Sequence, residues 1–79
     1  MNVDVYPNPC NHSTTITIDG ENMENGSFKL YDSIGCLVRM ENMNRNNIYF
    51  EKKDLNAGVY FFIIESDGKL ISSGKLIIL

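Results

Sequence analysis

The residues best suited to chemistry lie close together near the start of the chain, where the single histidine, His12, stands between Cys10 and Ser13. A histidine beside a thiol or a hydroxyl could act as the base of a nucleophilic enzyme. Adjacent residues of a strand face opposite sides, so Ser13 points away from its neighbour. No orienting third group or Gly-x-Ser-x-Gly turn accompanies them. We therefore predict an exposed loop histidine and no catalytic residues.

A second cluster could bind a cation, because Asp19, Glu21 and Glu24 offer carboxylate oxygens within the 19–26 segment. Their spacing does not match the calcium loop of an EF-hand. Aspartate stabilises turns without a metal, so solvated turn acids are the favoured interpretation and a calcium site in this loop is the alternative. The chain also lacks a glycine-rich phosphate loop. No metal and no cofactor are predicted.

Length and charge exclude several classes of partner. The 79 residues suffice for one domain, and a domain of this size buries only about 60–65% of its unfolded surface, which leaves little room for a catalytic groove. The net charge of −3 and the scattered basic residues argue against nucleic acid. No apolar run approaches the ~20 residues of a membrane span, so no membrane insertion is predicted. Two unpaired thiols, Cys10 and Cys36, are favoured over one disulfide between them.

Short runs of β-branched and aromatic residues, separated by glycine, proline, asparagine and aspartate, predict an all-β domain. Alternation places Ile16 and Ile18 on one face of their strand, whereas the continuous apolar run 59–64 predicts a central strand covered on both faces. The Asn-rich segment 41–47 is predicted to be a loop. The expected strands number about seven, which is typical of a sandwich or barrel, and they span 3–6, 13–18, 27–31, 36–40, 47–51, 59–64 and 69–79.

Several short motifs follow one another in an order that resembles the C-terminal sorting domain of the type IX secretion system of Bacteroidota. They are Val5-Tyr6-Pro7-Asn8-Pro9, then Ile16-Thr17-Ile18, then Leu30-Tyr31-Asp32-Ser33-Ile34-Gly35, then Val38, then Leu55-Asn56-Ala57-Gly58-Val59-Tyr60, then Gly74-Lys75-Leu76-Ile77. Each motif is short, but their order and spacing make the combination specific. The resemblance implies ten sorting-motif residues, which are Tyr6, Pro7, Asn8, Pro9, Gly35, Gly58, Tyr60, Gly74, Lys75 and Leu76.

The resemblance also implies the fold and the function. The fold is expected to be a small immunoglobulin-like antiparallel β-sandwich, with Pro7 and Pro9 in a rigid turn, Gly35 at a hairpin bulge, and Gly58 with Tyr60 in a tyrosine corner. Residues 1–79 would be the C-terminal part of a larger exported protein, joined to a cargo domain. That protein would cross the periplasm, engage the outer-membrane translocon and its sortase and shuttle proteins, and reach the cell surface or the medium. One departure is Cys36, where relatives often have a basic residue.

Two other functions are compatible with the residues. An exposed aromatic row would suit a carbohydrate- or surface-binding module attached to a secreted hydrolase, although the chain has no tryptophan. A passive spacer domain is the third alternative. An unpaired strand edge could also add a strand from a partner, or pair two copies of the isolated domain.

Overall fold

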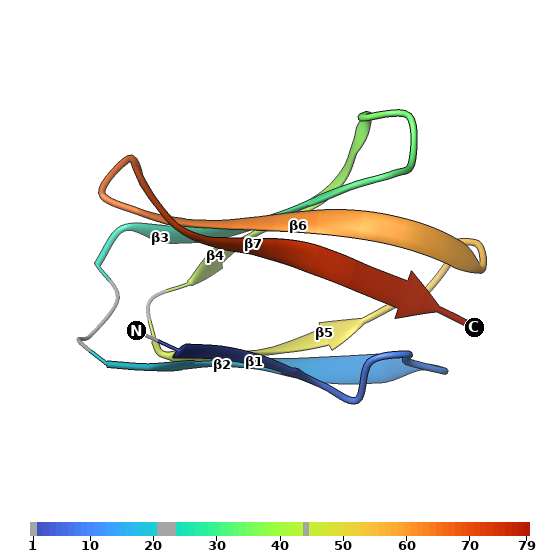
Figure 1. The fold of residues 1–79 in the computed structure, drawn as a ribbon, viewed down its shortest axis with the longest axis horizontal. Coiled ribbons are helices and arrows are strands. Elements are labelled where there is room, and N and C mark those ends of the chain that lie inside the picture. Colours follow the sequence, from blue (N-terminus) through green and yellow to red (C-terminus); the bar gives the residue numbers. More distant parts are fainter. Residues whose placement is uncertain (1, 21–23, 44) are drawn as a thin grey trace.

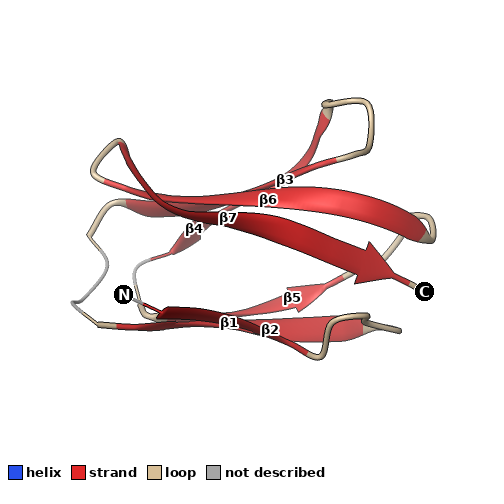
Figure 2. Ribbon diagram, in the orientation of Figure 1, coloured by secondary structure: helices blue, strands red, loops and turns tan. Residues whose placement is uncertain are grey.

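The computed structural model describes residues 2–20, 24–43 and 45–79 and consists of two antiparallel sheets packed face to face (Figures 1 and 2). Its described residues contain no helix with the length and hydrophobicity that a membrane span requires. The strands are β1 (Asn2–Tyr6), β2 (Ser13–Asp19), β3 (Gly26–Tyr31), β4 (Leu37–Met43), β5 (Asn47–Glu51), β6 (Gly58–Ser66) and β7 (Lys69–Ile78).

The prediction of a small antiparallel β-sandwich of about seven strands is confirmed, in an arrangement compatible with an immunoglobulin-like fold. One sheet has the order β1-β2-β5, and the other has the order β4-β3-β6-β7. Both prolines of the Pro7-Asn8-Pro9 turn follow β1, where they end the pairing of β1 with β2 because proline cannot donate to a ladder. The chain then returns through β2 and crosses between the sheets three times, at the connections β2–β3, β4–β5 and β5–β6.

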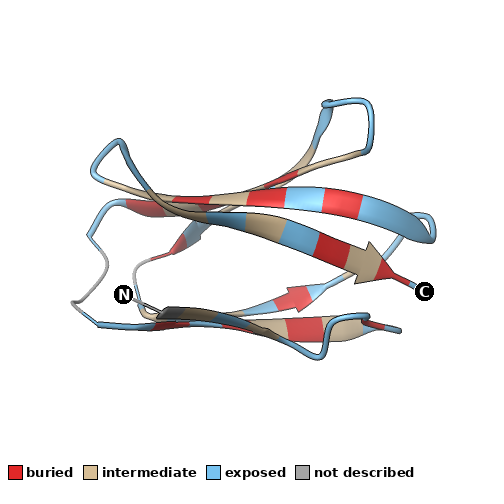
Figure 3. Ribbon diagram, in the orientation of Figure 1, coloured by how far each residue is buried: buried red, intermediate tan, exposed pale blue. Residues whose placement is uncertain are grey.

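The core lies between the sheets and is built by the period-two alternation of the strands (Figure 3). Phe28 of β3 is its centre, since its ring lies 5.7 Å from that of Phe50 in β5 and 5.9 Å from that of Phe62 in β6. The predicted inward residues Ile16 and Ile18 are fully buried on the facing sheet. Phe28 therefore joins the two sheets through aromatic contacts in addition to the apolar area that it buries.

Two details of the predicted strands are wrong. The Asn-rich segment is not a loop throughout, because β4 continues to Met43, whose side chain is only 1% exposed and belongs to the core. The run 59–64 is central in its sheet but is covered on one face only. Val59 and Phe61 are 41% and 46% exposed, whereas Tyr60 and Phe62 point into the core. The described strands form two layers only, and no third layer covers the outer face of β6.

Candidate functional site

The turn between β1 and β2 is bonded to the last residues of the chain. The side chain of Asn8 donates from Nδ2 to the carbonyl oxygen of Lys75 at 2.7 Å, and its Oδ1 accepts from the amide of Ile77 at 3.0 Å. The Cys10 amide donates to the carbonyl of Ile77 at 2.8 Å, and the Leu79 amide donates to the carbonyl of Cys10 at 2.9 Å. The Asn8 side chain and the Cys10 backbone thus form the hydrogen bonds that a neighbouring strand would otherwise make along the end of β7.

We call this contact the β7 clamp and define it by Asn8, Cys10 and residues 75–79. A hydrogen bond from the first sheet holds its turn in place. The hydroxyl of Thr14, a buried residue of β2, donates to the carbonyl of Pro7 at 2.7 Å. Since a buried hydroxyl needs a partner, this bond fixes the turn against the first sheet while its tip reaches the second sheet. The clamp therefore joins the two layers at one side of the sandwich.

The opposite edge of this end of β7 is paired with β6, where the tyrosine corner is found. Tyr60 lies opposite Leu76, and Gly58 lies opposite Ile78. The hydroxyl of Tyr60 donates to the carbonyl of Asn56 at 2.7 Å, four residues upstream, which is the geometry expected for such a corner. A buried phenol is satisfied in this way while its ring packs in the core.

Gly74 allows an aromatic ring to lie directly over the β7 backbone. It is paired with Phe62, and a Cβ added at Gly74 would come within 2.6 Å of Cζ and 2.8 Å of Cε2 of that ring. Any side chain at position 74 would therefore displace a ring that is stacked against Phe28. Close approach of a neighbouring group, rather than backbone conformation, requires the glycine here.

A row of four residues crosses the outer face of the second sheet and ends at Lys75, the residue after Gly74. The register pairs Leu37 of β4 with Tyr31 of β3, Tyr31 with Phe61 of β6, and Phe61 with Lys75 of β7. Directly opposed side chains on one face lie within contact distance of one another. Among the described residues, Lys75 has no ion pair, whereas the neighbouring Lys29 and Glu65 are paired at 2.8 Å.

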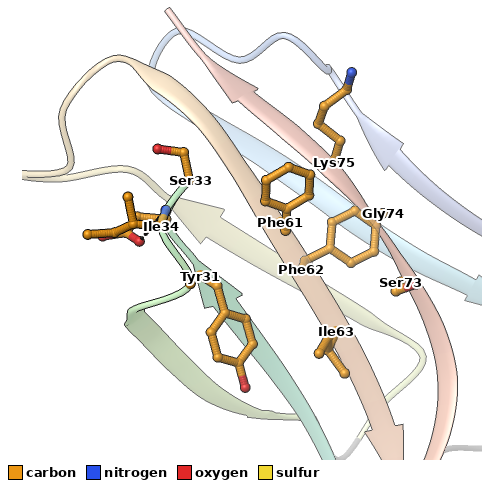
Figure 4. A pocket seen from close by; sticks show the side chains of 11 residues that line it. Tyr31, Ser33, Ile34, Phe61, Phe62, Ile63, Ser73, Gly74 and Lys75 are labelled. Carbon is orange, nitrogen blue, oxygen red and sulfur yellow. Dashed lines mark hydrogen bonds between the residues drawn. The ribbon is translucent and has the colours of Figure 1, made fainter.

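The turn after β3 rises beside this row and encloses a hollow of about 770 Å³ (Figure 4). The Asp32 carboxylate accepts from the amides of Ile34 at 3.1 Å and Cys36 at 2.9 Å, and the Gly35 amide donates to the Asp32 carbonyl at 3.0 Å. Gly35 has a φ of +91°, a conformation that glycine adopts without strain. The bulge expected at Gly35 lies beyond the turn instead, where the register of β3 and β4 shifts between Leu30 and Tyr31. These bonds hold the wall of the hollow in a single shape.

The structure brings several of the ten predicted sorting-motif residues around the second half of β7, although they are spread along the whole sequence. Asn8 bonds to it, Gly58 and Tyr60 pair with it, and Gly35 lines the hollow beside it. The role of these residues in sorting stays a prediction. Pro7 and Pro9 flank Asn8 in the same turn, and Gly74, Lys75 and Leu76 belong to β7 itself. Tyr6 is not brought to β7, because it ends β1 in the first sheet with an exposed side chain.

The sequence does not predict the positions of two side chains, Phe61 beside β7 and Arg39 beside β5. Phe61 belongs to a run that is apolar without interruption and was predicted to be covered on both faces, so its exposure and its pairing with Lys75 become evident only from the register. Arg39 is one of the scattered basic residues of the sequence, which predicts a surface position for it. It points inward instead, lies 5.1 Å above the Phe50 ring and donates to the carbonyls of Glu51 at 2.9 Å and Lys52 at 3.3 Å.

The groups first considered for catalysis are separated. Cys10 is buried in the core, where burial raises the pKa of its thiol, whereas His12 is exposed in the loop. A nucleophilic cysteine needs the opposite environment, one that lowers the pKa of the thiol. Cys36 is exposed in the turn beyond Asp32, and both cysteines are free thiols.

The residues considered for a cation do not form a site within the described part of the chain. No group of three histidine, cysteine or acidic side chains comes together there. Asp19 and Glu24 are exposed, and Glu21 lies outside the described residues, so the alternative of a calcium loop at 19–26 is only partly visible in the structure.

The chain matches a known protein family. A family model described as a secretion system C-terminal sorting domain matches residues 4–79, which is nearly the whole chain and includes every motif gathered around β7. No curated protein matches the chain.

Proposed function

Since this chain belongs to the family of secretion system C-terminal sorting domains, we propose that it directs a larger parent protein through the outer membrane and is then removed. The family establishes the coarse function, a C-terminal sorting signal of the type IX secretion system, which implies export to the surface or the medium. It is not a family of enzymes.

The observation that carries the proposal is the convergence of distant motifs on the second half of β7. A signal read from a folded domain needs a surface that exists only after folding, and the β7 clamp joins residues 67 and 69 positions apart. The translocon, its shuttle proteins and its sortase are the proposed partners. In the proposed sequence of events, a cargo domain precedes residues 1–79, the parent crosses the periplasm, and a sortase cleaves before the domain and attaches the cargo to the surface.

The test is a fusion of a signal peptide, a fluorescent or enzymatic reporter and residues 1–79, expressed in a host with a type IX system. We expect the reporter outside the outer membrane and shortened by the mass of the domain. The matched controls are the same fusion without residues 1–79 and the full fusion in a strain without the translocon. Both should leave the reporter in the periplasm.

Three outcomes are informative. Periplasmic retention of the complete fusion in a competent host would overturn the proposed function. Export without shortening would support the sorting signal and contradict removal by a sortase. Release into the medium, rather than recovery with lipopolysaccharide-bearing membranes, would contradict surface attachment.

A second candidate, carbohydrate binding, is favoured by a separate observation on the outer face of the first sheet. Tyr6 and Tyr49 both pair with Thr15, from opposite sides, and are 76% and 62% exposed. Two exposed rings separated by one strand form a short platform on which sugar rings could stack. A glycan array probed with the fusion tests this, and binding that Tyr49→Ala does not reduce would contradict it.

A further inference from the structure

The hollow beside β7 has the properties of a docking surface rather than of an ordinary solvent-facing sheet. Its floor is the outer row that includes Tyr31, Phe61 and Lys75, and its wall is the turn that carries Ile34 (Figure 4). Phe61 is 46% exposed and Ile34 is 83% exposed. Exposed apolar side chains that occur singly need no explanation, but several that surround one depression indicate a binding site.

The hollow is formed before any partner arrives. Four hydrogen bonds hold the Asp32–Cys36 turn, and the register of three strands fixes the floor. A volume of about 770 Å³ is large enough for several side chains. Preorganisation of this kind lowers the conformational entropy that binding would otherwise cost.

The charge at the rim identifies the chemistry of the occupant. Lys75 is exposed and unpaired among the described residues, in a chain whose net charge is −3. The Asp32 carboxylate, which also lines the hollow, is engaged in its own turn, and the nearby Lys29 is paired with Glu65. The hollow therefore presents apolar surface beside one available cation.

From these observations we propose that the hollow between the Asp32–Cys36 turn and Phe61 holds a segment of a protein of the export machinery, in which an apolar side chain stands beside a carboxylate. The apolar side chain contacts Phe61 and Ile34, and the carboxylate pairs with Lys75. This inference rests on the proposed function, because it specifies the partner of a sorting signal.

Two other occupants fit less well. In a symmetric pair of copies, the same patch would face itself, and the one carboxylate that lines each hollow, that of Asp32, is engaged in its own turn. A membrane surface that is held electrostatically needs several basic residues, and the described residues that line the hollow include one, Lys75. A protein segment with one carboxylate matches both the shape and the charge.

The experiment uses the reporter fusion described above, with Phe61→Ser and Lys75→Glu as test variants. The matched controls are Tyr49→Ser, which removes an exposed aromatic side chain from the other sheet, and Lys69→Glu, which makes the same change of charge at the other end of β7. We expect each test variant to lower the exported fraction about tenfold, as loss of a central contact residue does. The controls should be exported like the unmodified fusion.

Thermal unfolding of each purified fusion shows whether a variant acts through folding. Where the domain transition of Phe61→Ser is lowered, Ile34→Ser decides, since Ile34 lies at the tip of a turn and takes no part in the core. A second wild-type fusion with another reporter, overproduced in the same cell, should reduce export of the first by competition. The same competitor carrying Phe61→Ser should not.

Each result bears on the proposal. Normal export of both test variants would overturn the docking surface while leaving the sorting function intact, whereas failure of the unmodified fusion would overturn the sorting function itself. Loss with Phe61→Ser but not with Lys75→Glu would contradict the carboxylate on the partner. A Phe61-dependent dimer of the purified fusion would identify a second copy as the occupant and overturn the proposal.

Discussion

The edge and the outer face of the last strand differ in how far their polar groups are bonded within the domain. Along the edge from Lys75 to Leu79, the backbone is bonded to Asn8 and Cys10. On the outer face of the same stretch, the Lys75 side chain has no ion pair among the described residues and stands beside half-exposed Phe61. The fold uses one side of this segment for its own stability and leaves the other side exposed.

This difference divides the sorting-motif residues into two groups. Asn8, Tyr60, Gly74 and Leu76 are satisfied within the domain, by hydrogen bonds or by core packing. Lys75 is not satisfied internally. Residues of the first group should affect export through the stability of the domain, whereas a residue of the second group should affect export with little change in stability.

The largest expected contrast is between adjacent residues of β7. Leu76→Ala removes a fully buried side chain and should lower the free energy of unfolding by about 2–5 kcal/mol. Lys75→Ala removes an exposed one and should change it by about 0.5 kcal/mol or less. Urea denaturation of the two variants measures both values, and similar losses would show that Lys75 also belongs to the structural group.

A smaller loss is expected when the close approach at Gly74 is disturbed. Gly74→Ala places a methyl group within 2.6 Å of the Phe62 ring, so we expect about 1–3 kcal/mol of destabilisation through overpacking. Phe62→Leu, which shortens the side chain at the contact, is the matched background. The cost of Gly74→Ala should be smaller in that background. Equal costs in both backgrounds would show that the Phe62 ring is not the obstacle.

The β7 clamp is tested by Asn8→Ala, which removes two hydrogen bonds from the edge of the strand. We expect a loss of about 1–2 kcal/mol, because each such bond contributes roughly 0.5–1.5 kcal/mol net. Amide hydrogen exchange at Ile77 should become faster at the same time. Asn11→Ala, in the same loop and exposed, is the control. Unchanged exchange at Ile77 in Asn8→Ala would contradict the clamp.

The sequence was sufficient for the strands but not for this division of roles. Alternation, one continuous apolar run and turn residues located all seven strands apart from the end of β4, because those signals are local. The bond from Asn8 to Ile77 joins residues 69 positions apart, and no local pattern specifies it. Likewise, the run around Phe61 is continuously apolar, so which face is covered depends on the number of layers that the chain can build. The order of the motifs could be recognised, but only the fold places them around one strand.

Tertiary contacts that outweigh local sequence preference explain the two remaining differences between the predicted and the observed structure. Asparagine and glutamate in the 41–47 segment favour a loop, yet β4 extends to Met43 because its side chain fills the core. Arg39 lies among residues that predict an ordinary strand, and its inward position becomes evident only when β5 supplies carbonyl acceptors and the Phe50 ring. Contacts between strands from different sheets decide both cases.

The smallest effect concerns Cys10, the clamp residue whose side chain faces the core, in contrast to exposed Cys36. Burial raises the pKa of the Cys10 thiol above its ordinary value of 9.0, against a smaller lowering by the charge of Lys52. As the pH rises, the thiol ionises in the unfolded protein before it ionises in the folded protein. The stabilisation that the buried neutral thiol provides is therefore complete below the unfolded pKa and is lost as the pH rises from there through the folded pKa. Raising the pH from about 8 to about 10 should therefore destabilise the protein more than it destabilises Cys10→Ala. Cys36→Ala, measured by the same urea denaturation, should retain the full pH dependence, and its loss in that variant would assign the effect to the wrong thiol.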